Sequence, residues 1–371
     1  MRIENVQVLL NNGEFRNGSV TFDERIQNIE VHDNLRSGST CYLIPGLIDI
    51  HTHGALGGDH TDGCGDKMRE IAEYYAKNGT TSFLATTLTA TEEALSNAVR
   101  IAGSYERPEN GARCQGIHLE GPFFSHEKRG AHPADLIRQP DISMFKRLNE
   151  LSGNKVKLVA VSPELDGAME FIKEVSKVCH ISLAHSACEY KTAMLGFASG
   201  ATLVTHLFNG MNPFLHREPG IIGAAMDAGA FVEVICDGYH LHPSVIRLIF
   251  KVFGRKVCLI SDSLRCAGLP DGDYESAGLA VTVKSGKAIL KDGGSLAGST
   301  ITLLQGVRNA VSLGIPLADA ISAASINCAR AVGRTGLIGS ITPGAFADLV
   351  LLDGELNIKK VYMGGKEITG T

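Results

Sequence analysis

Eight short apolar runs, spaced along residues 43–263, restrict the possible folds of this chain more than any other feature. Continuous apolar runs of this length are typical of buried parallel strands. Amphipathic stretches that suit helices lie between them, at 66–77, 92–104, 168–178 and 243–253. Eight strands alternating with helices can close on themselves, so we predict an α/β fold, a (β/α)8 TIM barrel. The eight runs are 43–53, 82–88, 115–121, 156–163, 181–186, 202–209, 231–238 and 257–263.

The two ends of the chain do not follow this pattern. Residues 1–43 alternate apolar and polar side chains around turn signals, and residues 342–371 contain two further short strands. Each end is too short to fold alone, so we predict that they pair in one small β-sandwich domain beside a barrel of residues 44–341. The glycine-rich stretch 264–298 has a hairpin pattern and follows the last barrel strand, which predicts an insertion on the catalytic rim.

The composition narrows the class of protein. A chain of 371 residues with 44% hydrophobic and 20% charged residues can bury a large core. Its net charge of −5 argues against binding to nucleic acid or to an anionic membrane. The nine cysteines form no CxxC pair, and the first residues lack a secretory pattern. We therefore expect a cytoplasmic protein with reduced thiols.

Several polar side chains follow the apolar runs at the positions where barrel enzymes place their chemistry, the carboxyl ends of the strands. Taken singly, each has an ordinary explanation as a hydrogen-bonded or solvated group, and the His-x-His pattern occurs a second time at His240 and His242. Together, so many unpaired polar groups at one barrel mouth would be costly without an ion. The metal-capable residues are His51, His53, Glu120, His185, His206 and Asp262.

Imidazole and carboxylate ligands favour zinc, with iron, manganese and cobalt as alternatives, over calcium. Such an ion lowers the pKa of a bound water and polarises a carbonyl or phosphoryl oxygen. Asp262 is then expected to take the proton of the water and pass it to the leaving group. The residues thus predict metal-assisted hydrolysis of an amide or ester without naming the substrate.

Longer motifs extend this interpretation. PGLIDIHTHG (45–54) and PGAFADLVLLD (343–353) resemble the amidohydrolase superfamily. Within it, the remaining motifs resemble the N-acetylglucosamine-6-phosphate deacetylase family, in order from about residue 40 to residue 353. They are HLEGPF (118–123), GAHP (130–133), THLFNGMNPFLHREPG (205–220), CDGYHLHP (236–243), LISDSLRCAG (259–268) and LAGSTITL (296–303).

The resemblance implies a barrel of the amidohydrolase type and deacetylation of N-acetylglucosamine 6-phosphate, with N-acetylgalactosamine 6-phosphate as the alternative substrate. A catalytically inactive scaffold barrel is the alternative from another class, although no metal-capable residue is missing. Glu120, His185 and His206 match the primary metal ligands, and the intact His51–His53 pair predicts room for a second ion.

The resemblance also assigns the other roles. Asp262 matches the general base and acid, His132 the group that polarises the acetyl carbonyl, and Arg217 the phosphate-binding arginine. The family is typically dimeric, with His240 reaching the phosphate of a neighbouring subunit. The further substrate contacts implied are Ala131, Asn209, Gly210, Asp237, His240, Leu296, Ala297 and Gly298.

Overall fold

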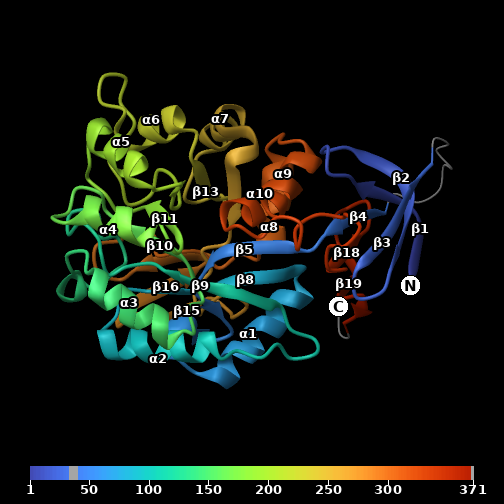
Figure 1. Cartoon of the computed structure of the whole chain (residues 1–371), viewed down its shortest axis with the longest axis horizontal. Coiled ribbons are helices and arrows are strands. Elements are labelled where there is room, and N and C mark those ends of the chain that lie inside the picture. The colour runs from blue at the N-terminus through green and yellow to red at the C-terminus, as the bar shows by residue number, and fades with distance from the viewer. Residues whose placement is uncertain (33–40, 369–371) are drawn as a thin grey trace.

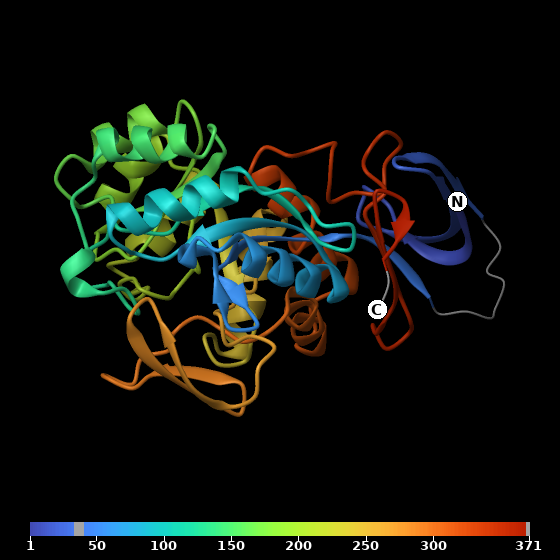
Figure 2. The same cartoon turned by 90° about the horizontal axis from the view of Figure 1, so that it is seen from below.

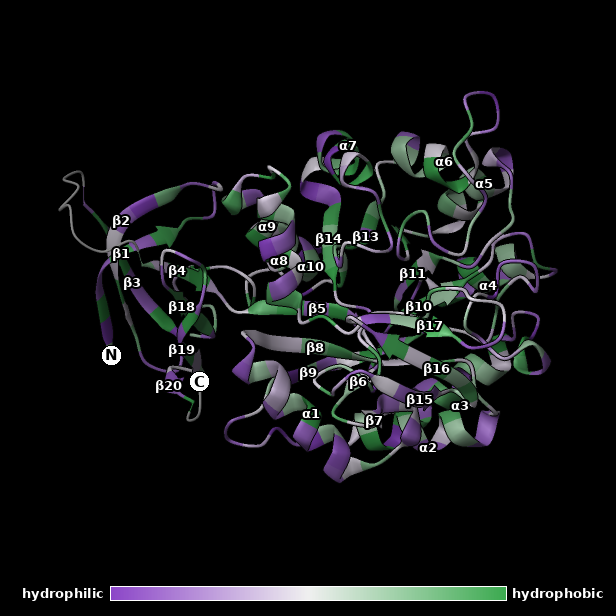
Figure 3. Cartoon of the chain, turned by 180° about the vertical axis from the view of Figure 1, so that it is seen from behind, coloured by the Kyte–Doolittle hydropathy of each residue, from purple (hydrophilic) through white to green (hydrophobic). Residues whose placement is uncertain are grey.

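The computed structural model describes residues 1–32 and 41–368. It contains a large barrel of strands surrounded by helices and a smaller β domain (Figure 1). The first and the last strand of the chain both lie in the smaller domain (Figure 1). In Figure 3 the strands of the barrel carry mainly hydrophobic residues, whereas the helices around them alternate between hydrophobic and hydrophilic faces. No helix within 1–32 or 41–368 combines the length and apolar composition needed to cross a membrane.

The barrel contains eight parallel strands in one sheet. Each predicted apolar run overlaps one of them, which confirms the predicted barrel. The sheet closes where β14 returns beside β5, and the Asp262 N–H donates to the His51 carbonyl at 2.9 Å. In order around the sheet the strands are β5 (Leu47–Thr52), β8 (Thr80–Thr87), β9 (Arg113–Leu119), β10 (Val156–Val161), β11 (His180–Leu183), β12 (Leu203–Val204), β13 (Phe231–Ile235) and β14 (Val257–Ile260).

Helices cover the outside of the barrel. α7 shows why these segments are helical: Pro243 begins it at a position that needs no N–H donor, and Ile246, Ile249 and Phe253 turn one apolar face inward. The helices are α1 (Gly65–Lys77), α2 (Glu92–Gly103), α3 (Ile142–Leu151), α4 (Ala168–Val175), α5 (Tyr190–Ser199), α6 (Gly220–Ala228), α7 (Pro243–Phe253), α8 (Leu303–Ser312), α9 (Leu317–Ala323) and α10 (Ile326–Ala331). Short 3-10 turns are η1 (His60–Asp62), η2 (Ala134–Leu136) and η3 (Gly254–Lys256).

Apolar side chains fill the lower part of the barrel interior. Ile48, Ile50, Leu158 and Ile260, from three strands, are at most 1% exposed and belong to one buried cluster. This apolar cluster fills the barrel interior on the amino-terminal side of the strand ends. The polar side chains inside the barrel therefore lie at the carboxyl ends of the strands.

The small domain is a seven-stranded sheet built from both chain ends, as predicted. β4 joins the two ends, because it pairs parallel with β1 and antiparallel with β18. Phe22 and Tyr362, from opposite ends of the chain, meet edge to face at 5.4 Å in its core. The order is β20 (Lys366–Glu367), β19 (Ile358–Met363), β18 (Leu349–Leu352), β4 (Tyr42–Pro45), β1 (Arg2–Leu9), β2 (Phe15–Phe22) and β3 (Ile26–Val31).

The division into residues 1–43 plus 342–371 and residues 44–341 stays a prediction. β4 continues the hydrogen bonding of the small sheet to Pro45, two residues past the predicted border. Arg113 of the barrel binds Asp348 beside the small sheet, with Nε 2.9 Å from Oδ2. The two parts are therefore tied by an ion pair as well as by the chain.

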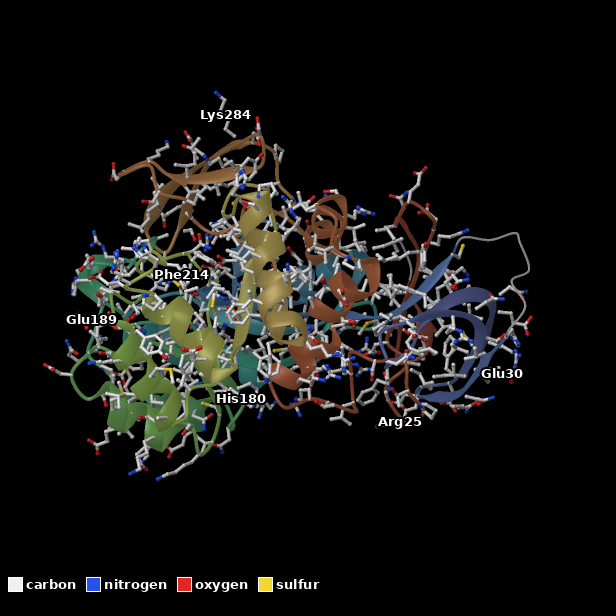
Figure 4. The ribbon with its side chains drawn as sticks, turned by 90° about the horizontal axis from the view of Figure 1, so that it is seen from above. Arg25, Glu30, His180, Glu189, Phe214 and Lys284 are labelled. Carbon is white, nitrogen blue, oxygen red and sulfur yellow. The ribbon has the colours of Figure 1, made fainter. Side chains whose placement is uncertain are left out.

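The segment after β14 forms a separate three-stranded antiparallel sheet, which we call the rim sheet. Its strands are β15 (Gly272–Ser276), β16 (Leu279–Lys284) and β17 (Lys287–Leu290). The rim sheet projects from the barrel (Figure 2). Its outer tip at Lys284 is far from Arg25 and Glu30, which mark the small domain in Figure 4. The rim insertion and its hairpin are confirmed.

Candidate active site

The carboxyl ends of the barrel strands bring all six predicted metal-capable residues together. His185, His206 and Asp262 are each the second residue after a barrel strand. Their φ angles are positive, at 45°, 28° and 49°. Residues with a side chain rarely adopt this conformation, which costs on the order of 1–3 kcal/mol at each position. The backbone strain coincides with the polar cluster and turns these side chains toward one centre.

Glu120 is the shared member of two groups of possible ligand atoms. In the first group, its Oε2 lies 3.2 Å from His53 Nε2, and the Nε2 atoms of His51 and His53 are 3.2 Å apart. In the second, its Oε1 lies 3.0 Å from His206 Nε2, which is 3.1 Å from His185 Nε2. One carboxylate thus connects two pairs of imidazoles.

Asp262 also contacts the two histidines of the first group. Its Oδ1 lies 3.2 Å from His53 Nε2 and 3.4 Å from His51 Nε2. The side chain is almost fully buried. Burial raises the pKa of Asp262, but the charge of His51 and the hydrogen bond from His53 have the larger combined effect and lower this pKa to about 2. The carboxylate is therefore ionised at neutral pH and able to accept a proton.

The donor atoms fit a divalent cation. His185 Nδ1 donates to the Lys128 carbonyl at 2.8 Å, and His51 Nδ1 donates to Glu233 Oε2 at 2.9 Å. A metal ligand must be a neutral ring, and these Nδ1 protons leave the Nε2 lone pairs of His51 and His185 available to a cation. Burial disfavours the charged rings, but Glu120 and Asp262 still raise the pKa of His51, and that of His53 to about 9. Positive charge, as protons or as a metal ion, is therefore needed to balance these two carboxylates. Imidazole nitrogens with carboxylate oxygens suit zinc and neighbouring transition metals.

The structure reveals a supporting residue that the sequence analysis missed, Glu233 in the middle of β13. Its side chain is fully buried, and its Oε2 accepts from His51 Nδ1 and, at 3.3 Å, from the His206 N–H. Such a carboxylate fixes the tautomer of a ligand histidine. A carboxylate in the middle of the apolar stretch FVEVI (231–235) was the signal that could have identified it.

A second missed residue, His118, lies on β9 behind the cluster. Its ring packs edge to face on His51 at 4.8 Å. Burial holds the pKa of His118 well below its ordinary value, so the ring is neutral. It supports His51 by packing.

His132 lies beside Glu120 on the loop after β9. The Thr89 N–H donates to its Nδ1 at 3.4 Å, which leaves the ring proton on Nε2, 3.6 Å from Glu120 Oε2. Burial lowers the pKa of His132 to about 3. His132 is thus a neutral ring whose Nε2–H can donate a hydrogen bond into the site.

A cavity of about 580 Å³ opens over the cluster. Its size suits a small ligand such as a sugar phosphate. Ser276, Val281 and Leu290 of the rim sheet form part of its wall, and the cationic side chains of Lys128 and Arg129 line it as well. The predicted substrate contacts that line it are Ala131, His132, Asn209, Gly210, His240, Leu296, Ala297 and Gly298.

Two predicted contacts do not line this cavity. Arg217 lies on an exposed loop and contacts the adjacent ring of His216. Phe214, which is labelled in Figure 4, belongs to the same loop and is also exposed. Asp237 instead binds His240, with Oδ2 2.7 Å from Nδ1, and accepts the backbone N–H of His240 at 3.0 Å. Within its own chain, Asp237 therefore orients His240, and Arg217 is separate from the site.

Comparisons with known proteins agree with this geometry. The amidohydrolase family matches residues 42–368. An N-acetylglucosamine-6-phosphate deacetylase from Vibrio furnissii is 35% identical over 94% of this chain and 90% of its own length. An N-acetylgalactosamine-6-phosphate deacetylase from Escherichia coli O157:H7 is 37% identical over 87% of each chain. The structure of an N-acetyl-D-glucosamine-6-phosphate deacetylase variant from Mycobacterium smegmatis, in complex with N-acetyl-D-glucosamine-6-phosphate, superposes with a TM-score of 0.92 at 30% identity, covering 100% of this chain and 99% of the other.

Proposed function

The chain belongs to the amidohydrolase family, and we propose that it hydrolyses the acetyl amide of N-acetylglucosamine 6-phosphate, releasing glucosamine 6-phosphate and acetate. The observation that supports this most directly is the pair of imidazole groups sharing Glu120, beneath a cavity of about 580 Å³. Such a cluster binds a divalent metal, and we propose zinc. N-acetylgalactosamine 6-phosphate is the second candidate substrate, because the Escherichia coli relative that acts on it is 37% identical.

We assign the metal positions from the donor groups. Glu120, His185 and His206 would hold the main ion, and His51 with His53 would complete a second position that shares Glu120. A bound divalent ion supplies polarisation of the acetyl carbonyl and a more acidic water at neutral pH.

The chain's own residues then handle the protons. Asp262, ionised and facing the cluster, accepts a proton from the attacking water and delivers it to the amine nitrogen as the C–N bond breaks. His132 donates its Nε2–H to the acetyl oxygen, and this bond strengthens as negative charge develops there. One residue thus moves the proton while the other stabilises the oxyanion.

Recognition of the phosphate involves a second copy in this proposal. Arg217 does not line the cavity of its own chain, so a neighbouring subunit is the arrangement that would bring its guanidinium to a bound phosphate. His240 lines the cavity of its own chain. We also propose, as predicted from the sequence, that it reaches the phosphate bound by a neighbouring subunit. We therefore propose that the protein is a homodimer. We also propose that it acts in the cytoplasm, as expected from its sequence.

The test measures release of acetate and of free amine from both sugar 6-phosphates, with and without a chelator. We expect turnover of N-acetylglucosamine 6-phosphate, its loss after chelation and its return when zinc is added. Faster turnover of the galactose epimer would favour the second candidate. Absence of bound metal by elemental analysis, together with no turnover of either sugar, would refute the proposal and indicate a scaffold barrel.

A further inference from the structure

A second cavity, of about 420 Å³, lies at the other end of the barrel from the candidate active site. Gly254 and Arg255, which line it, precede β14, whereas Asp262 follows that strand. The β1–β2 turn at Asn11 and Asn12 forms one wall, and α7, α9 and α10 form the others. In Figure 1 this turn lies beside α9, on the side of the barrel that faces the small domain. We call this space the interdomain cavity.

The interdomain cavity is strongly cationic. Four basic side chains line it, against the single carboxylate of Asp319. Among residues 1–32 and 41–368, none of the four takes part in an ion pair with a carboxylate. They are Arg247, Lys251, Arg255 and Arg330. A concentration of uncompensated positive charge is unexpected on a chain whose net charge is −5.

The hydrogen bonds of these side chains leave most of their donors available. Arg247 Nη1 donates to the Leu313 carbonyl at 3.4 Å, and Arg330 Nη1 donates to Asn327 Oδ1 at 3.4 Å. Arg247 and Lys251 lie one helical turn apart on α7, where like charges repel. An anion that bridges them would remove this repulsion.

The neutral lining indicates the remaining chemistry of the ligand. Phe250, Ile315 and Pro316 supply an apolar surface, and Asn11, Asn12, Ser322 and Asn327 supply hydrogen-bonding groups. Guanidinium groups bind phosphate oxygens in pairs, and the volume matches a small metabolite. We propose that the interdomain cavity binds a small metabolite with two or more negative charges carried by phosphate groups, at a site separate from the active site.

The location allows such a ligand to act on the barrel. Asn327 Nδ2 donates to the carbonyl of Val257, the first residue of β14, at 2.8 Å. α10, which carries Asn327 and Arg330, packs against β5 and β14. Since these two strands lead to His51 and Asp262, a ligand held by Arg330 would stabilise the helix that supports them.

The test is calorimetric titration of the full, zinc-loaded chain with fructose 1,6-bisphosphate. The cavity variants described below separate binding at this site from binding in the catalytic cavity, and fructose serves as the uncharged control. We expect one site per chain, affinity that falls with salt, and a higher melting temperature with the bisphosphate. The double variant Arg247→Gln/Arg330→Gln should weaken binding about tenfold or more, since two charge-assisted contacts are lost.

Two further variants complete the test. Arg247→Gln/Lys251→Gln alters only exposed side chains of α7 and should weaken binding without impairing folding. Lys191→Gln, which removes an exposed lysine of α5 outside the cavity, should leave the affinity within about twofold of wild type. Deacetylation by all three variants should stay at the wild-type level. Equal affinity in wild type and both cavity variants, or no binding in wild type, would overturn the proposal while leaving the deacetylase activity unaffected.

Discussion

Replacing Glu233 with glutamine tests whether the metal centre depends on a carboxylate that touches no substrate. Glu233 Oε2 accepts from His51 Nδ1 at 2.9 Å and from the His206 N–H at 3.3 Å, so one atom orients two histidines of the cluster. The glutamine keeps the size of the side chain but removes its charge. Its amide can still accept from His51, although only through its single oxygen.

The magnitude follows from the change in bond type. A hydrogen bond to a charged group contributes about 1.5–3 kcal/mol and a neutral one about 0.5–1.5 kcal/mol, so the loss is about 1–2 kcal/mol. Removing the partner of a ligand histidine typically lowers metal affinity by about 10–100-fold. We therefore expect Glu233→Gln to bind zinc roughly tenfold more weakly, with turnover largely restored by excess zinc.

The assay is competition for zinc against a chelator of known affinity, with the unfolding free energy measured in parallel. Asp348→Asn is the matched control, because Asp348 is also buried and accepts from Arg113 far from the cluster. Both variants should lose stability, but only Glu233→Gln should lose zinc affinity. Equal zinc affinity in Glu233→Gln and wild type would refute the assigned role of Glu233.

Four further outcomes are expected. Asp262→Asn should lose turnover by several orders of magnitude yet retain zinc by elemental analysis; near-wild-type turnover would exclude it as the proton carrier. Arg217→Ala should raise KM for the phosphorylated sugar far more than for the unphosphorylated one, and equal effects on both would contradict a phosphate contact. Burial raises the pKa of Asp237, but the hydrogen bond and charge of His240 lower it below its ordinary value. The stability that this carboxylate adds is complete above its unfolded pKa of about 3.9 and is lost as the pH falls through the lower folded value. The difference in unfolding free energy between wild type and Asp237→Asn should therefore shrink as the pH falls below about 3.9; a pH-independent difference would contradict this. At pH 8 a thiol reagent should label Cys64 first, because it is the one exposed cysteine of the nine and burial raises the pKa of Cys188 to about 12; unchanged fast labelling of Cys64→Ser would disprove this.

Much of the site could be predicted because parallel strands impose a simple rule. Once the apolar runs are taken as barrel strands, the residues after each run must meet at one end. This rule places Glu120, His185, His206 and Asp262 at the same end of the barrel, although 142 positions separate the first from the last. The eight strands, the helices 66–77 and 243–253, and the pairing of the chain ends follow from periodicity in the same way.

Other features depend on contacts that no local pattern encodes. Glu233 meets His51 across 182 positions, and its effect depends on which oxygen faces which nitrogen. Arg217 has the motif expected of a phosphate ligand, yet it does not line the cavity of its own chain. The interdomain cavity arises only because a turn at Asn11 packs beside helices more than 230 residues later.

The sequence alone thus determined the class of fold, the end of the barrel that bears the chemistry and the type of ligand, because strand periodicity and residue chemistry are local properties. The tertiary structure decided which histidines share Glu120, which tautomers they adopt and where the remaining charges gather. These depend on distances of a few ångströms between segments distant in sequence, and such distances are set by the packing of the whole chain.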